Sequence, residues 1–378
     1  MKIAMIGHKR IPSREGGIEI VVEEISSRLV ALGHTVHVYN RKGKYVHGSE
    51  NEYSKIKEYK GVRILHIPTI SAKGLEALVY SFFATIRALF GRYDAIHFHA
   101  EGPGVMILIS RLFGIRSVST IHGLDWKTAK WGNFARKYIQ FGEKVIARRA
   151  NEIITLSTSN QKYFLDTYGR KTNFIPNGVN KPINRKPSLI TEKYGLQGRD
   201  YLLFLSRLVP GKGLEYLIDA FKQIRTDTRL VIAGGSSHTN EYVKEIKERA
   251  ADDSRILFTG FIQGELLDEF FGNCTAYILP SDSEGMPLSL LEAMSYGCFC
   301  LISDIPELTE IVEDYAVTFR KSDVDDLRNK MEQLINDGFA AYTHEEISAF
   351  ILNKYNWDKV VEKHLLLYNK TKADNDGN

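Results

Sequence analysis

The feature that most constrains the fold is a pattern that occurs twice along the chain: an apolar strand, a glycine-containing loop, an amphipathic helix and a second strand. The first copy occupies Lys2–Ile6, Gly7–Gly17, Ile18–Leu32 and Thr35–Tyr39. A helix that connects two apolar strands predicts that the strands lie parallel in a sheet with helices on its faces. We therefore expect an α/β protein.

More strands are expected at similar intervals through the first half of the chain. They are Arg63–Ile67, Ala95–His99, Ser117–Ile121 and Glu152–Leu156. Together with the two strands of the opening pattern, and with helical stretches between most of them, they are enough for one doubly wound domain.

The pattern begins again after a polar, proline-containing stretch at residues 176–199. The second copy runs through Tyr201–Leu205, Ser206–Gly213, Leu214–Ile224 and Arg229–Ala233. Further strands are expected at Arg255–Thr259, Ala276–Pro280 and Phe299–Ser303. This repetition predicts a second doubly wound domain.

The length of 378 residues also favours two domains, because one core rarely grows to this size. We expect an N-terminal domain over residues 1–175 and a C-terminal domain over residues 176–352. A helix within residues 353–370 is expected to return to the first domain, and the polar tail at residues 371–378 to be disordered.

The composition is that of a globular protein, with 43% hydrophobic and 25% charged residues. A net charge of +4 is too small to argue for a nucleic-acid partner. The three cysteines form no CxxC pair and are expected to be reduced, as in the cytoplasm.

The apolar run at the N-terminus is too short for a signal peptide. The most apolar stretch, Leu75–Phe90, includes Glu76 and Arg87, so we expect a buried helix of the first domain rather than a membrane span.

Residues 283–297 contain several candidate ligand-binding residues. They follow the strand expected at Ala276–Pro280 and so lie beyond its carboxyl end, where open α/β sheets bind ligands. Pro287 suits the first position of a helix, which would leave the amides of Gly285 and Met286 to attract an anion such as a diphosphate. Glu284 and Glu292 could accept hydrogen bonds from the hydroxyls of an extended ligand. Equally, the two glutamates could be a helix-dipole partner and a solvated surface residue.

The whole segment, SEGMPLSLLEAMSYG, resembles the signature of the family 4 glycosyltransferases of the GT-B fold. The resemblance implies two Rossmann-type domains that face each other across a cleft. It places Glu284 beside the donor sugar, the backbone of Gly285, Met286, Pro287 and Leu288 around that sugar, and Glu292 on the ribose hydroxyls.

Two other segments of the second half are similar to donor-binding loops of this family. Ser206–Gly213 resembles the diphosphate loop, with Arg207 and Lys212 as cations that would stabilise the leaving nucleotide. Gly260 and Phe261 resemble the loop against which the base packs, although a simple strand-end turn is an alternative.

The first half carries matching segments as well. Gly16 and Gly17 are similar to the glycine turn that approaches the donor phosphate. His122, in IHGLDW, corresponds to the family histidine near the donor sugar and the acceptor. Candidates on the acceptor side are His99, Asp125 and Trp126. The sequences HGLDW and GGIE further resemble those of a bacterial subgroup that includes rhamnosyltransferases of surface polysaccharide assembly.

His97 and His99 are expected to project from one face of their strand near Glu101, an arrangement that could hold a zinc ion. No further Cys or His falls in this segment, so we expect a wall of the acceptor site rather than a zinc site. The resemblance likewise implies no metal and no other cofactor, since the cations of the loops take that role.

Residues 126–150 are strongly basic. Phe134, Tyr138, Phe141 and Val145 recur there at helical spacing, with Lys137, Lys144 and Arg148 along one edge. Such a surface would suit an anionic membrane that carries a lipid-diphosphate acceptor. An ordinary amphipathic helix with its aromatic residues in the core is equally compatible.

Together these features predict a cytoplasmic retaining transferase, at the inner face of the plasma membrane if the basic surface binds lipid. It would move a hexose or deoxyhexose from a nucleoside-diphosphate sugar to a glycan or a polyprenyl-diphosphate-linked acceptor. The alternatives are a nucleotide-sugar epimerase of the same fold and a non-catalytic nucleotide-sugar-binding partner.

Overall fold

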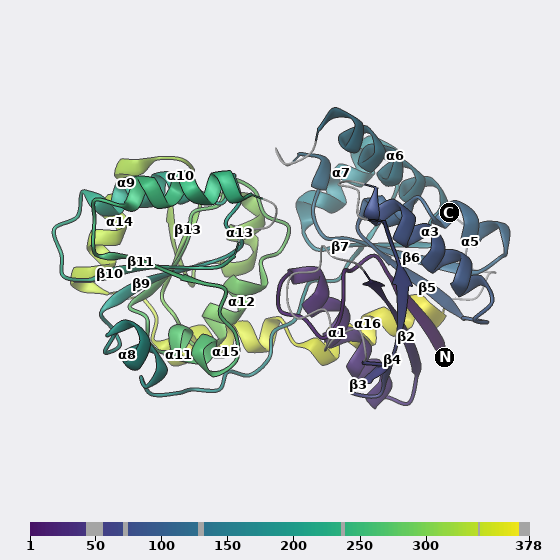
Figure 1. Cartoon of the computed structure of the whole chain (residues 1–378), viewed down its shortest axis with the longest axis horizontal. Coiled ribbons are helices and arrows are strands. Elements are labelled where there is room, and N and C mark those ends of the chain that lie inside the picture. The colour runs from purple at the N-terminus through teal and green to yellow at the C-terminus, as the bar shows by residue number, and fades with distance from the viewer. Residues whose placement is uncertain (43–55, 71–74, 128–131, 236–238, 339–340, 370–378) are drawn as a thin grey trace. The chain divides into compact units, whose positions relative to one another are not determined.

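The computed structural model describes residues 1–42, 56–70, 75–127, 132–235, 239–338 and 341–369. The chain divides into two compact units, of which unit 1 comprises Met1–Asn177 and Trp357–Asn378, and unit 2 comprises Gly178–Asn356. Each unit is built on its own sheet, fully or mostly parallel, and has its own apolar core (Figure 1). The tail predicted to be disordered lies outside the described residues.

Unit 1 contains an eight-stranded sheet in the order β3-β4-β2-β1-β5-β6-β7-β8, in which β3 alone is antiparallel to its neighbour. The strands are β1 (Lys2–Ile6), β2 (Thr35–Lys42), β3 (Glu58–Tyr59), β4 (Val62–Pro68), β5 (Ala95–His99), β6 (Arg116–Ile121), β7 (Glu152–Thr155) and β8 (Asn173–Phe174). The chain therefore winds outward from β1 in both directions, which is the doubly wound arrangement predicted from the sequence.

The helices of unit 1 cover both faces of this sheet. They are α1 (Gly17–Ala31), α3 (Glu76–Leu89), α4 (Glu101–Gly104), α5 (Ile107–Leu112), the 3₁₀ helix η1 (Asp125–Lys127), α6 (Asn133–Arg149), α7 (Thr158–Tyr168) and α16 (Trp357–Asn369). Right-handed crossovers place α1 on one face and the helices between β4 and β8 on the other. The chain's last helix, α16, packs against α1 (Figure 1).

Unit 2 contains a six-stranded, fully parallel sheet in the order β11-β10-β9-β12-β13-β14. The strands are β9 (Tyr201–Leu205), β10 (Arg229–Ala233), β11 (Ile256–Gly260), β12 (Ala276–Leu279), β13 (Cys300–Ser303) and β14 (Val317–Phe319). The strand order reverses between β9 and β12. The carboxyl ends of these two strands are the point where sheets of this type bind ligands.

The helices of unit 2 are shorter on average than α1 or α6. They are α8 (Leu189–Tyr194), α9 (Leu214–Lys222), α10 (Asn240–Ala250), α11 (Glu265–Asn273), α12 (Leu288–Ser295), α13 (Pro306–Val312), α14 (Val324–Asp337) and α15 (His344–Lys354). α9 and α14 pack against each other over one part of the core, and α12 packs against α15.

The helix expected at Leu75–Phe90 is present in unit 1 as α3, but the prediction that it is buried holds for only one of its sides. α3 lies on the surface and buries only one side, with Tyr80, Ala84 and Ala88, while Phe82 and Phe83 are exposed and Phe90 is 83% exposed. The sequence pattern misleads because both sides of α3 are apolar. None of the described helices is long and apolar enough to cross a membrane.

A test of the packing of α16 uses two adjacent leucines on that helix. Leu367 is 5% exposed and Leu366 is 67% exposed. We expect Leu367→Ala to lower the free energy of unfolding of unit 1 by about 2–5 kcal/mol, because it leaves a cavity, and Leu366→Ala to change it by less than about 0.5 kcal/mol. Tryptophan fluorescence during denaturation measures this, since Trp126 and Trp357 belong to unit 1 and the sequence has no tryptophan within Gly178–Asn356. Equal effects of the two substitutions would contradict the packing described.

Candidate active site

In unit 2, the loop after β9 is brought against the segment after β12 by a glycine. Gly213 has a φ of +72°, and a Cβ at this position would lie 2.0 Å from the carbonyl oxygen of Pro280. Only glycine tolerates both the left-handed backbone and this close approach. The two loops can therefore lie in direct contact.

Hydrogen bonds then join the two loops. The amide of Asp282 donates to the carbonyl of Gly211 at 2.9 Å. The hydroxyl of Tyr216, in the first turn of α9, contacts the carbonyl of Pro280 and donates to Oδ1 of Asp282 at 2.9 Å. Tyr216 and Asp282 were not singled out from the sequence, because nothing in their local patterns indicates the contact.

An ion pair connects two of the predicted site residues. Nζ of Lys212 lies 2.5 Å from Oε1 of Glu284, and the hydroxyl of Ser281 donates to the same oxygen at 2.7 Å. The side chains of Lys212 and Glu284 are only 14% and 7% exposed. Charged groups with so little exposure are stable only when they are paired. Each residue therefore fixes the position of the other, while Arg207 in the same loop is exposed.

The structure corrects the predicted role of Pro287, which was expected at the first helical position. α12 begins at Leu288, and Pro287 is the N-cap residue with extended backbone (φ −71°, ψ 117°). The first amides of α12 still have no partner within the helix, so this end retains its attraction for anions. Met286 and Leu288 are buried, and Glu292 is the fifth residue of α12 and is half-buried.

A buried tyrosine lies beneath these loops. The hydroxyl of Tyr277, in β12, donates to Oγ of Ser289 at 2.8 Å and lies 3.2 Å from the carbonyl oxygen of Leu205. Burial raises the pKa of Tyr277 well above its usual range, so its hydroxyl stays protonated. Tyr277 thereby holds the start of α12 to the end of β9. The local sequence around Tyr277 does not indicate this contact.

The loops after β10 and β11 share the same edge of the sheet. A Cβ on Gly234 would lie 1.8 Å from the carbonyl oxygen of Ser206, and the amide of Gly234 donates to the carbonyl of Gly260 at 2.9 Å. The next residue, Phe261, has an exposed side chain. The structure thus collects all the predicted residues of unit 2 at one edge, and adds Gly234.

In unit 1, histidines collect at the carboxyl ends of β5 and β6. Nδ1 of His99 lies 3.1 Å from Nε2 of His122, and the rings of His97 and His99 stack with their centroids 4.2 Å apart. The two nitrogens of His97 lie 2.7 Å from the hydroxyl of Tyr368, in α16, and 2.7 Å from that of Thr120. The described residues contain no group of three or more His, Cys, Asp or Glu that could hold a metal ion.

Asp125 and Trp126 lie in η1, close to two buried glutamates. The amide of Asp125 donates to Glu101 at 3.2 Å, and Nε1 of Trp126 donates to Glu143 at 2.9 Å. Burial raises the pKa of Glu101 well above its usual range, and the nearby charge of Asp125 raises it further. The contact of Trp126 fixes the orientation of its ring.

Gly16 and Gly17 are the N-cap and the first residue of α1. A Cβ on Gly16 would lie 2.2 Å from Oε2 of Glu19, whose other oxygen accepts a hydrogen bond from the amide of Lys9 at 2.8 Å. A side chain at position 16 would have to displace the buried carboxylate of Glu19, which lies over the start of the helix. Gly16 and Gly17 therefore lie at the same edge of unit 1 as the loop that follows β1.

Burial also sets the charge of the histidines. It lowers the pKa of His122 to about 3 and those of His8 and His364 to about 4, and it lowers the pKa of His97 and His99 well below the usual value. All five rings are therefore neutral at pH 7. His122 can exchange hydrogen bonds with a ligand but cannot supply a positive charge.

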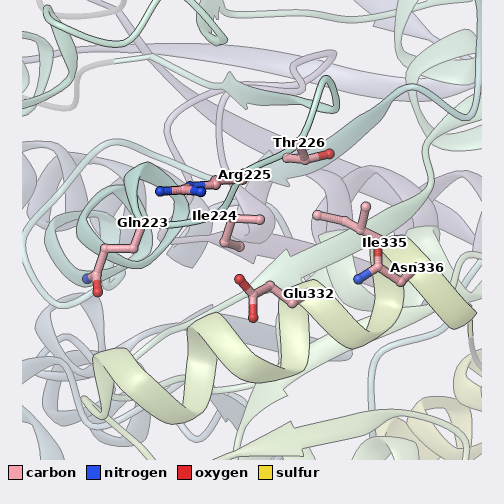
Figure 2. Close-up of a pocket in the computed structure, with 7 residues that line it drawn as sticks. All are labelled: Gln223, Ile224, Arg225, Thr226, Glu332, Ile335 and Asn336. Atoms are coloured by element: carbon pink, nitrogen blue, oxygen red, sulfur yellow. The ribbon is translucent and has the colours of Figure 1, made fainter.

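Unit 2 also has a cavity that lies away from these residues. It has a volume of about 300 Å³ and lies between residues 223–226 and the helix α14 (Figure 2). Residues 223–226 lead into β10, so the cavity is at the amino-terminal edge of the sheet. The loops that carry Lys212 and Glu284 follow the carboxyl ends of their strands. The cavity is therefore separate from the candidate site.

Two family descriptions match the chain. Residues 15–181 match Glycosyltransferase Family 4, and residues 189–367 match Glycosyl transferases group 1. The chain belongs to the family 4 glycosyltransferases. It is a retaining glycosyltransferase of the GT-B fold that takes its sugar from a nucleotide-sugar donor.

Several glycosyltransferases of other organisms are similar to this chain over most of its length. An uncharacterised glycosyltransferase of Methanocaldococcus jannaschii is 25% identical, with 97% of this chain and 98% of the relative covered. The UDP-Gal:alpha-D-GlcNAc-diphosphoundecaprenol alpha-1,3-galactosyltransferase of Escherichia coli is 26% identical, with 81% and 84% covered. The structure of Anabaena HepE in complex with UDP and glucose is similar in fold, with a TM-score of 0.80, 18% identity, and 97% and 98% of the two chains covered.

The buried histidines of the glycosyltransferase predict a pH dependence of its stability. Below pH 6.5 the unfolded chain binds protons at His8, His97, His99 and His364, whereas the folded chain does not until its lowered pKa values are reached. Stability is therefore highest above pH 6.5 and falls between pH 6.5 and about 4. Each histidine contributes up to about 1.4 kcal/mol per pH unit.

Denaturation at pH 7 and pH 5, followed by tryptophan fluorescence, measures this loss in unit 1. His364→Gln removes one buried titrating group and should reduce the slope by about one histidine's share. Equal stability at the two pH values would contradict the assignment of neutral buried histidines.

Proposed function

We propose that this protein transfers a hexose or deoxyhexose, with retention of configuration, from a nucleoside-diphosphate sugar to a hydroxyl of a glycan or a lipid-linked glycan. The observation that carries the proposal is the contact between the loops after β9 and β12, in which Lys212 pairs with Glu284. Two cations and a helix N-terminus lie there, at the point where the strand order of unit 2 reverses. This combination suits a diphosphate attached to a polar sugar.

In the proposed site, Arg207 and Lys212 balance the diphosphate. As the bond to the sugar breaks, negative charge grows on the leaving nucleotide. Preorganised cations therefore stabilise the transition state more strongly than the ground state. Lys212 is already held by Glu284 and Ser281, so little reorganisation is needed when the donor binds.

The remaining donor contacts are proposed as follows. The carboxylate of Glu284 and the backbone of residues 285–288 hold the sugar, and Glu292 accepts hydrogen bonds from the ribose hydroxyls. The exposed ring of Phe261, beside Gly260, packs against the base. No further carboxylate is assigned as a covalent nucleophile, and we propose no glycosyl-enzyme intermediate.

Unit 1 is proposed to bind the acceptor through His99, His122, Asp125 and Trp126, which lie along one edge of its sheet. Because burial keeps His122 neutral, we propose that its ring accepts a hydrogen bond from a sugar hydroxyl or donates one to it, and that it does not balance charge.

We further propose that the acceptor is linked to a polyprenyl diphosphate and that the enzyme works at the inner face of the plasma membrane. In support, α6 exposes Phe134 and Phe141 together with Lys137 and Lys144 on one side. Tyr138 points inward, where its hydroxyl donates to Gly102 at 3.0 Å. The Escherichia coli relative is likewise named for an acceptor linked to diphosphoundecaprenol.

The experiment for the proposed function is a thermal-shift panel of UDP-, GDP- and dTDP-sugars. Binding to the folded form raises the melting temperature, so the correct base should stand out. Transfer is then followed with and without a lipid-linked acceptor, which separates a transferase from an epimerase because the latter needs no acceptor. No shift with any donor and no release of a nucleoside diphosphate would contradict the proposal.

The site residues predict a division of kinetic effects. Glu292→Ala should raise the KM for the donor by about 10- to 100-fold, since it removes hydrogen bonds made to the bound donor. Arg207→Ala should lower kcat by about 100- to 1,000-fold with a smaller change in binding, since its charge acts mainly on the transition state.

Glu248→Ala and Lys244→Ala are matched controls, because they remove an acid and a cation from an exposed pair on α10. Both should leave the kinetics unchanged. Unaltered kinetics for the Glu292 and Arg207 variants would overturn their roles.

A further inference from the structure

The outward side of α3 is apolar along its whole length. Residues at helical spacing of three or four positions form this side. They are Leu75, Val79, Phe82, Phe83, Ile86, Arg87 and Phe90, all exposed or half-buried. A surface helix ordinarily places polar residues on this side. On α3, Arg87 is the one polar residue of the set.

α5 continues the same surface. Leu108 is exposed, and Leu112 and Phe113 are 84% and 64% exposed. α3 and α5 pack against each other and lie side by side on the same face of the unit 1 sheet (Figure 1). We call Leu75, Phe82, Phe83, Phe90, Leu108, Leu112 and Phe113 the α3–α5 surface. Exposed apolar groups gathered in this way mark an interaction site rather than chance exposure.

The two helices also end alike. Residues 89–91 and residues 112–114 both have the sequence Leu-Phe-Gly, and the phenylalanine is in each case the C-cap residue of its helix. α3 leads into β5 and α5 leads into β6, two adjacent parallel strands. Phe90 and Phe113 therefore project at the same, amino-terminal edge of the sheet, away from His99 and His122.

Positive charges dominate the helical segments that carry the α3–α5 surface, although Glu76 begins α3 and the exposed Asp94 follows it. Residues 77–93 and 102–116 contain no Asp or Glu. Arg87, Arg92 and Arg111 are exposed in these segments. α6, which packs beside α5, adds the exposed Lys137 and Lys144. A fitting partner therefore offers an apolar region to the leucines and phenylalanines and anionic groups to the neighbouring arginines and lysines.

We propose that the α3–α5 surface inserts into the interfacial region of a bilayer that contains anionic lipid. The phenylalanine and leucine side chains enter the acyl boundary, and the arginines contact headgroup phosphates. A second copy of this chain is a poorer partner. A symmetric pairing would set the arginines of one copy against those of the other, with no carboxylate in these segments to compensate.

The inference rests on the proposed function in one respect, namely that the acceptor is lipid-linked. It adds an apolar anchor to the charges of α6. Electrostatic attraction alone is weakened by salt, whereas apolar insertion is not, and stable attachment to a membrane generally needs two such signals. Binding to vesicles can be measured without donor or acceptor, so it is independent of transfer.

The test is sedimentation of the purified protein with vesicles of phosphatidylcholine alone or mixed with phosphatidylglycerol, at low and high salt. We expect the wild type to bind the mixed vesicles and to retain part of this binding at high salt. The double variant Phe90→Ser/Phe113→Ser should bind the mixed vesicles at least about tenfold more weakly than the wild type. It should also lose the part of the binding that resists high salt. Leu366→Ser, an exposed leucine on the opposite face, is the matched control and should bind as the wild type does.

Melting temperatures, and the thermal shift with the donor, should be unchanged in the double variant because Phe90 and Phe113 are exposed. This separates loss of the anchor from loss of the fold or of donor binding. The inference is overturned if the wild type does not bind the mixed vesicles, or if the double variant binds as well as the wild type. It is also overturned if the substitutions convert a dimer to a monomer without changing vesicle binding.

Discussion

The candidate site depends on one ion pair, between Lys212 and Glu284. The two residues are distant in the sequence and belong to loops that follow β9 and β12, which are adjacent strands of unit 2. The parallel sheet puts both strand ends at one edge, and the reversal of strand order leaves room there for a ligand. Gly213 lets the loops touch, and the buried pair makes their separation costly. Strand order, loop conformation and charge pairing therefore act together to keep a cation at the place where a diphosphate would bind.

Much of this arrangement could be predicted from the sequence. The predicted bounds of strands such as β1, β5, β9 and β10 agree with the observed ones, because each is a short segment rich in apolar residues between turns or helices. The short edge strands β3, β8 and β14 were missed, since two or three residues form no recognisable pattern. Residues such as Lys212 and Glu284 were selected by resemblance to a family, and their mutual contact became visible only in the structure.

Other parts could not be predicted because they depend on neighbours distant in sequence. Tyr277 holds α12 to β9, and Gly234 admits the carbonyl of Ser206, yet neither residue stands in a distinctive local pattern. Pro287 was assigned one position too far into its helix, which is within the usual uncertainty of helix ends. The error at α3 is of another kind. Periodicity identifies a helix with apolar residues on all sides but cannot tell which side faces solvent, and that exposed side suggests a membrane partner.

The central claim is that Lys212, held by Glu284, binds the diphosphate of the donor. Calorimetric binding of UDP, GDP and dTDP to the wild type, Lys212→Ala, Glu284→Ala and the double variant tests it directly. For the nucleotide that the wild type binds, we expect Lys212→Ala to weaken binding by about tenfold or more, and the double variant to lose less than the sum of the single losses because the two side chains are coupled. Binding of none of the three nucleotides by the wild type, or unchanged affinity in Lys212→Ala, would contradict the account.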